Sequence, residues 1–242
     1  MIHLRYISHY IKLSLSTFLL LFLWIPAVNA DKCLLFSDIF QKSPKLKCIG
    51  ENFKTALKAV DICVEFISLP SKRATLQLLR AELDGALMRA TEYKKLVGDV
   101  AIMIHEPLIS TQGLLISYDT RLTSIDKLIG RNLGIVRGSA WSNAQISDGM
   151  FIHLVNYPDQ LVQMLVKKRV DAILIDSVTA LAFKSELEAT VRAEIVSLPG
   201  YPWLSVKHKK LVPQIEQAIK EYRAKYKYFQ CGLIDAGHSV NE

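Results

Sequence analysis

The chain has 242 residues, which is enough for one or two domains with a sizeable core, and 50% of them are hydrophobic. Its formal net charge is +7, with lysines clustered in residues 207–210 and 220–227. A solvated helix face is the simplest interpretation of these clusters, and an anionic ligand or an acidic membrane surface is the alternative.

The N-terminus has the three regions of a secretory signal peptide. Arg5 and Lys12 supply positive charge, and residues 13–25 form an apolar run that is too short for an ordinary transmembrane helix. Small residues at Val28 and Ala30 predict cleavage after Ala30, and an uncleaved anchor is the alternative. We therefore expect an exported, soluble mature protein, for which nucleic acid is not an expected partner.

The segment 64–89 reads as a strand, a helix and a second strand. Side chains alternate up to Pro70, which cannot donate to a strand ladder. Apolar residues then recur at helical spacing over 74–83, and Asp84-Gly85 predicts a turn before the next strand. A strand–helix–strand unit of this length is typical of parallel sheets.

The rest of the chain continues the alternation of strands and helices. Further strands are predicted at 32–38, 97–104, 113–117, 132–136, 152–155, 170–176, 194–198 and 203–207. Helices are predicted at 51–60, 91–96, 124–129 with Ser124 as its cap, 140–146, 158–168, 178–188 and 213–227. Residues 41–50 and 199–202 are predicted as a loop and a turn.

This order predicts an α/β protein with two lobes. Strands and helices alternate in 31–112 and again in 113–196, and a strand and a helix follow residue 197. After a signal peptide at 1–30, we assign 31–112 plus 197–242 to lobe 1 and 113–196 to lobe 2. Two crossings, near 110–113 and 197–203, would form a hinge with a ligand cleft between the lobes.

Four cysteines, at 33, 48, 63 and 231, allow three disulfide pairings, and the sequence does not choose among them. A Cys33–Cys48 bond would close a short loop, and a Cys63–Cys231 bond would tie the C-terminus to the first sheet. A buried free thiol at Cys63 is the alternative. No CxxC pair occurs, so neither a zinc site nor thioredoxin chemistry is indicated, and we expect no metal and no cofactor.

Two segments resemble a known family. LPSKRATLQLLRAELDGALMR resembles an LP-x-x-RA…G-x-LDG-x-x-R pattern of periplasmic solute-binding proteins of the polar-amino-acid ABC transporter type (extracellular solute-binding protein family 3), in a divergent branch. GRNLGIVRGSAW…LVQMLVKKRVDAILID resembles the second lobe of the same family. The resemblance implies a type II periplasmic-binding-protein fold, in which each lobe is a mainly parallel sheet flanked by helices.

The resemblance also implies a function. Such a protein would act in the periplasm as a monomer, bind a small polar solute (an amino acid or a related carboxylate or amine) between its lobes, and deliver it to an ABC permease. An orphan or sensory protein that presents its ligand to a membrane receptor is an alternative.

The resemblance implies ligand-binding roles for four residues. Gly138, Ser139 and Trp141 match the family's anion-binding turn, where N–H groups at a helix start are donors without partners. Ser139 as a simple helix cap is the alternative. Asp176, at the end of a predicted strand, matches the carboxylate that receives a ligand ammonium, and a cap of the next helix is the alternative. Asp171 is expected to be structural.

Arg89 is a candidate for binding the anionic group of the ligand, because an arginine can bind it with two hydrogen bonds. The sequence departs from the family here. A T-x-x-R arginine is expected beyond the LDG turn, and Tyr93-Lys94-Lys95-Leu96 stands there instead. Either Lys95 or Arg89 replaces that arginine, or the ligand is not an α-amino acid.

Aromatic residues could wall the cleft. Trp141 lies in the turn, and Tyr201 and Trp203 lie at the second crossing. The family's aromatic at the end of the first strand falls near Phe36 or Phe40, and the core is the preferred place for Phe36.

No enzymatic signature appears. HExxH, GxSxG and P-loop patterns are missing from the sequence, so we expect no catalytic residues and no enzyme. The alternative is a cyclohexadienyl-type dehydratase on the same fold, which would need an acid or a base in the cleft. Glu92, His105 and Glu106 are the candidates for that role.

Overall fold

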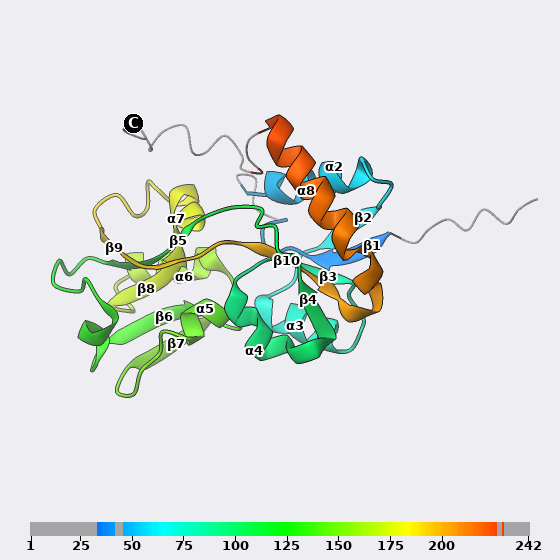
Figure 1. Ribbon diagram of the computed structural model, residues 1–242. Helices are drawn as coiled ribbons and strands as arrows, with labels where there is room; N and C mark the ends of the chain where they lie inside the picture. Colours follow the sequence, from blue (N-terminus) through cyan, green and yellow to red (C-terminus); the bar gives the residue numbers. More distant parts are fainter. Residues whose placement is uncertain (1–32, 42–45, 227–228, 230–242) are drawn as a thin grey trace, which may run out of the picture. The chain divides into compact units, whose positions relative to one another are not determined.

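The computed structural model describes residues 33–41, 46–226 and 229, which form two five-stranded sheets flanked by helices (Figure 1). The first sheet has the order β2-β1-β3-β10-β4, with β1 (Leu34–Ser37), β2 (Val64–Ile67), β3 (Gly85–Arg89), β4 (Ala101–Met103) and β10 (Tyr201–Ser205). The second has the order β7-β6-β8-β5-β9, with β5 (Gln112–Ser117), β6 (Asn132–Val136), β7 (Phe151–Val155), β8 (Ala172–Asp176) and β9 (Val191–Ser197).

Both sheets follow one plan. In the first, β1 pairs in parallel with β2 and β3, and β10 runs antiparallel between β3 and β4. In the second, β6 pairs in parallel with β7 and β8, and β5 runs antiparallel between β8 and β9. The predicted α/β class with two helix-flanked sheets is therefore confirmed.

Helices cover both faces of each sheet because the inner strands alternate their side chains between two apolar layers, whereas the edge strands β2, β7 and β9 are partly exposed. The longer helices are α2 (Cys48–Lys58), α3 (Ser71–Leu79), α6 (Pro158–Val166) and α8 (Val212–Tyr226). The shorter ones are η1 (Thr91–Tyr93), α4 (Lys94–Val97), η2 (Gly98–Val100), η3 (Ile125–Leu128), α5 (Ala140–Asn143), α7 (Ser177–Ala182) and η4 (Val206–Leu211). Figure 1 shows α2 and α8 alongside each other, and they share one core cluster with β1.

Several predicted boundaries were wrong. Helix α2 begins at Cys48, inside the predicted loop. Residues up to Val100 remain helical where a strand was predicted from 97, and Gly98 has a φ of +53°, a left-handed conformation that ends α4. Strand β10 begins at Tyr201, inside the predicted turn. Ser124 occupies the N-cap position of η3 but makes no capping hydrogen bond.

Two connections join the sheets, between β4 and β5 and between β9 and β10. The two segments pair with each other: the Gly200 N–H donates to the Ile109 carbonyl at 3.0 Å, and the Leu198 N–H donates to the Thr111 carbonyl at 2.7 Å. The two segments that connect the sheets therefore run side by side as a short antiparallel pair.

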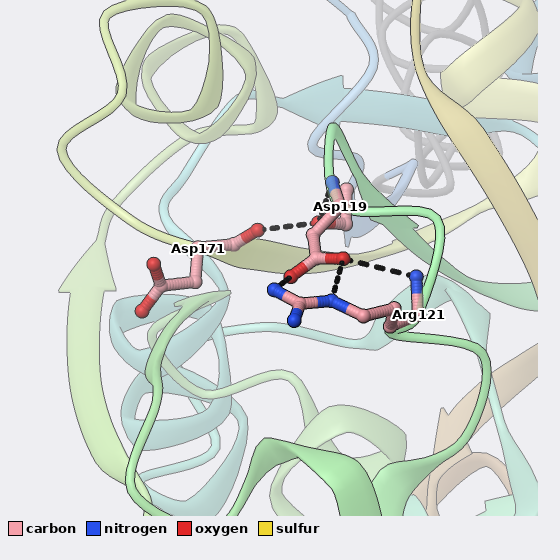
Figure 2. Close-up of polar contacts among 4 residues, drawn as sticks. Asp119, Arg121 and Asp171 are labelled. Atoms are coloured by element: carbon pink, nitrogen blue, oxygen red, sulfur yellow. Dashed lines mark hydrogen bonds and ion pairs between the residues drawn. The ribbon is translucent and has the colours of Figure 1, made fainter.

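Polar contacts fix the second sheet at the amino end of β8. The Asp171 carboxylate accepts from the backbone N–H of Asn132 at 2.7 Å, and its carbonyl accepts from Ser117. Beside it, Asp119 and Arg121 face each other across two side-chain hydrogen bonds in the turn after β5 (Figure 2). Asp171 thus has the structural role that was expected of it.

The structure pairs Cys33 with Cys63, and Cys48 is also disulfide-bonded. The suggested Cys33–Cys48 and Cys63–Cys231 bonds and the free thiol at Cys63 were therefore wrong. The reason is the register of the first sheet. The two cysteines directly precede Leu34 and Val64, which are paired partners on neighbouring parallel strands.

No helix in the described part of the chain is long and apolar enough to cross a membrane. The predicted signal peptide and cleavage point, like Cys231, lie outside the described residues.

Asp84 ties the start of β3 to its surroundings. One carboxylate oxygen accepts from the Leu35 N–H at 2.8 Å, and the other accepts from Lys207 at 2.8 Å and His208 at 2.7 Å. Burial raises the pKa of this carboxyl, but the hydrogen bonds from Leu35, Lys207 and His208 together outweigh burial and hold the pKa below its ordinary value.

The depressed pKa of Asp84 predicts acid sensitivity. A carboxyl with a lowered folded-state pKa stabilises the fold above its unfolded pKa of about 4, and that stability is lost as the pH falls through the folded-state pKa. We expect Asp84→Asn to lower the urea midpoint at neutral pH and to flatten the decline of stability below about pH 4. A wild-type and mutant pair with parallel pH profiles would contradict this role.

Candidate functional site

A cavity of about 100 Å³ lies where the carboxyl ends of strands from both sheets meet. Its lining from the first sheet comes from the turn after β1, the end of β3 and the start of α3. Its lining from the second sheet comes from the turn after β6, helix α5 and the end of β8. Its lining residues include Phe40, Ser71, Met88, Arg89, Tyr93, Gly138, Ser139, Trp141 and Asp176.

Arg89 is the central cation of this cavity. It is the last residue of β3, its side chain is buried at 8% exposure, and its Nη1 donates to the Ser71 hydroxyl at 3.0 Å. Its guanidinium lies over the Tyr93 ring, 5.3 Å from the ring centroid. Nε and Nη2 are buried and have no hydrogen-bond partner among the described residues. Such donors are costly to leave unpaired, so they point to a ligand acceptor.

The guanidinium also lies near a buried carboxylate, which the sequence analysis did not identify. Asp38 is 1% exposed and accepts from the Phe40 N–H at 2.9 Å and from Gln41 at 3.1 Å. Burial raises the pKa of Asp38, although these hydrogen bonds and the Arg89 charge partly oppose the rise. Asp38 therefore holds the turn that presents Phe40 to the cavity.

The Gly138–Trp141 turn lines the cavity. Gly138 has a φ of +82°, and a Cβ there would lie 2.6 Å from the Lys72 backbone nitrogen, so the turn closely approaches the start of α3. Ser139 occupies the N-cap position of α5 but makes no capping bond, and its hydroxyl pairs with that of Ser142 at 2.7 Å. The structure thus brings the turn and Ser71 to one place.

Asp176, the last residue of β8, lines the cavity and also caps α7. Its two carboxylate oxygens accept from the N–H and the hydroxyl of Thr179, at 2.8 and 2.6 Å. Burial raises the pKa of this carboxyl against the opposing effect of these hydrogen bonds. The backbone N–H groups of Asp176 and Val178 also interact with this carboxylate and help to oppose the rise. Asp176 therefore both caps α7 and lines the cavity.

The aromatic candidates divide between cavity and core. Trp141 and Phe40 line the cavity. The indole of Trp141 packs on Gly113, where a Cβ would come within 2.7 Å of it. Trp203 is 2% exposed and packs edge-on against Tyr93 in the first sheet's core, and Phe36 is fully buried. A cavity role for Trp203 was therefore wrong, because its side chain lies in the core of the first sheet, on a strand that pairs with β3 on one side and β4 on the other.

Other candidates lie away from the cavity. Lys95 is exposed and does not line it, so Arg89 is the basic side chain there. Glu92, His105 and Glu106 are not among its lining residues, and Glu106 pairs with Arg223 and Lys220. Within the described ranges, no group of three or more histidine, cysteine, aspartate or glutamate side chains could hold a metal ion.

Sequence reasoning missed Ser71, Met88 and Tyr93. A signal for Tyr93 was present, since it stands at the start of the segment that departs from the family pattern, four residues after Arg89. Ser71 follows Pro70 at the first turn of α3, where side chains face the ligand end of a sheet. Met88 carries no such signal.

Solved structures with this fold include several amino-acid-binding proteins. Holo ArgBP from T. maritima matches with a TM-score of 0.63 and 16% identity, over 78% of this chain and 90% of that one. AbpA from Streptococcus pneumoniae, bound to L-arginine, matches with a TM-score of 0.66 and 14% identity, over 83% and 93%. An ancestral arginine-binding protein bound to glutamine matches with a TM-score of 0.66 and 18% identity, over 81% and 94%.

At such identities these likenesses show that the chain shares the fold of these binding proteins, and they concern the fold alone. No protein-family model and no curated protein sequence matches the chain.

The approach of Gly138 to α3 can be tested against a matched glycine. Gly130 also has a positive φ, of +74°, but a Cβ there would meet nothing within 4 Å. Alanine at either position lowers the free energy of unfolding by about 1 kcal/mol, because a non-glycine residue disfavours the left-handed backbone. We expect Gly138→Ala to lower the free energy of unfolding by at least about 1 kcal/mol more than Gly130→Ala, because it also displaces the Lys72 backbone. Equal losses in chemical denaturation would show that the turn does not press on α3.

Proposed function

We propose that the chain is an exported binding protein that holds a small, carboxylate-bearing solute in this cavity and passes it to a membrane permease. The observation that carries the proposal is the pair of buried Arg89 nitrogens that have no partner among the described residues. In a planar guanidinium, Nε–H and one Nη2–H point the same way and together match the two oxygens of a carboxylate. These are the two donors without a partner among the described residues, while Nη1 is held by Ser71.

The remainder of the cavity suits the body of a small amino acid or a related acid. Asp176 supplies a carboxylate for an ammonium group, and Trp141 and Phe40 supply apolar walls that exclude water. The α3 N-terminus at Ser71 adds a partial positive charge on the same side as Arg89. Cation and carboxylate thus stand in one cavity, as a zwitterion requires.

Binding without catalysis is part of the proposal. The acids and bases named as dehydratase candidates do not line the cavity. Turnover of a prephenate-like substrate by the purified protein would overturn this part. Neighbouring genes that encode a receptor instead of a permease would favour the sensory alternative.

A thermal-shift screen tests the proposed function directly. A ligand that binds only the folded state raises the unfolding midpoint. We expect a shift with at least one member of a panel of amino acids, small carboxylates and amines at millimolar concentration. The absence of any shift across the panel would refute solute binding.

Arg89→Lys tests whether the guanidinium of Arg89 contributes to ligand binding. Lysine keeps the charge but cannot offer two parallel donors, so we expect affinity for the ligand found in the screen to fall roughly tenfold or more, about 1.4 kcal/mol. Arg73→Lys is the matched control, since Arg73 is exposed on α3 and does not line the cavity. Equal affinities of Arg89→Lys and the wild type by calorimetry would remove Arg89 from the site.

Asp176→Asn separates the role of Asp176 as a helix cap from its proposed role as the charged partner of a ligand ammonium group. Asparagine caps a helix as well as aspartate does, so the fold should keep its stability. A ligand with an ammonium group should lose about 2 kcal/mol of binding free energy, because its charged partner is gone. Asp171→Asn, at the other end of β8, is the control and should leave affinity unchanged. Unchanged binding of an amino acid by Asp176→Asn would leave Asp176 as a cap alone.

A further inference from the structure

Met88 has an unusual backbone conformation for a strand residue. Its φ is +58°, in the left-handed region that non-glycine residues rarely adopt. Three other described non-glycine residues with positive φ, at Asp61, Ala81 and Lys168, come just after helices, where this conformation is common. Met88 lies instead within β3, one residue before Arg89. Strain of this kind persists where the surrounding structure enforces it.

The left-handed residue belongs to a β-bulge. Arg89 pairs with Tyr201 and Ala86 pairs with Trp203, so two residues of β3 oppose one residue of β10. That one residue is Pro202, which has no N–H to contribute to the ladder. The pairing of β3 with β10 is therefore interrupted at Pro202, which has no backbone N–H to donate.

The bulge decides which face of the sheet Arg89 occupies. In a regular strand, Leu87 and Arg89 would point to the same face. Leu87 packs into the apolar cluster under α2 and α8, where a guanidinium would be buried among hydrocarbon. Arg89 instead contacts Ser71 and Tyr93, on the face that also holds Ala86. The extra residue thus reverses the side on which Arg89 emerges.

We propose that Met88 is a positioning residue, whose left-handed backbone turns the Arg89 guanidinium out of the core and into the cavity. Its side chain supports that conformation by packing on Gly200, where a Cβ would come within 2.8 Å of the Met88 Cε and 3.1 Å of its Sδ. The consequence for carboxylate binding rests on the proposed function, and the placement of Arg89 does not.

Two variants that both remove the thioether test the backbone. In a regular strand, glycine is less stable than alanine, whereas at a left-handed position the order reverses. We expect Met88→Gly to unfold at a higher temperature than Met88→Ala. Ala81→Gly is the matched control, because it relieves a left-handed residue away from the cavity and should also raise the midpoint. A more stable alanine variant at position 88 would overturn the proposal.

The position of Arg89 is followed by the ¹H–¹⁵N signal of its buried Nε–H, assigned by its loss in Arg89→Lys. We expect Met88→Gly and Ala81→Gly to leave this signal in place. Met88→Val should shift it or remove it, because a β-branched residue disfavours the left-handed backbone. A displaced signal in Met88→Gly, or an unmoved one in folded Met88→Val, would overturn the proposal. If Met88→Val does not fold, the glycine and alanine variants decide through their stabilities and signals.

Sodium acetate, the simplest carboxylate, separates this proposal from the proposed function. Acetate should shift the Arg89 signal in the wild type and in Met88→Gly, and should do so more weakly in Met88→Val. If acetate leaves the wild-type signal unchanged, carboxylate binding at Arg89 fails. The effect of position 88 on the ligand-free signal would still confirm or refute the positioning role.

Discussion

The site depends on one constraint, which is that a buried guanidinium must have its donors satisfied. Arg89 meets part of this requirement from the protein, through the Ser71 hydroxyl and the face of Tyr93. The buried Asp38 adds a favourable charge nearby, and its carboxylate accepts a hydrogen bond from the Phe40 N–H in its own turn. The Nε–Nη2 edge is the part of the requirement that the described residues do not meet. Two such parallel donors match the two oxygens of a planar anion.

The common plan of the two sheets explains why a cation and a carboxylate come together. Strand β3 is the third strand in the order of the first sheet, and β8 is the third strand in the order of the second. Each follows a helix, pairs in parallel with the central strand of its trio, and ends on a charged residue, Arg89 or Asp176. The carboxyl ends of parallel strands are where such sheets bind ligands, so repeating one unit brings a cation and a carboxylate to one cavity.

The sequence predicted the features that depend on local periodicity, and it missed those that depend on pairing. The strand–helix–strand unit at 64–89 shows clear periods, and the apolar run that ends at Asp176 is typical of a buried strand, so both could be placed from sequence alone. Predicting the Cys33–Cys63 bond requires knowing the register of β1 against β2. Predicting the burial of Trp203 requires knowing that β10 lies between β3 and β4. Methionine carries no turn signal, so the bulge at Met88 could not be foreseen.

The same geometry links ligand binding to the approach of the two sheets. Gly138, from the second sheet, lies against the start of α3, and it lines the same cavity as Ser71 and Arg89. Two guanidinium donors of Arg89 are buried there without a partner among the described residues, which costs free energy unless an acceptor replaces the lost water. On the proposed function, a carboxylate supplies that acceptor only when the turn and α3 are together. The ligand then stabilises the closed arrangement over an open one by its differential affinity, and a closing motion needs no other source of free energy.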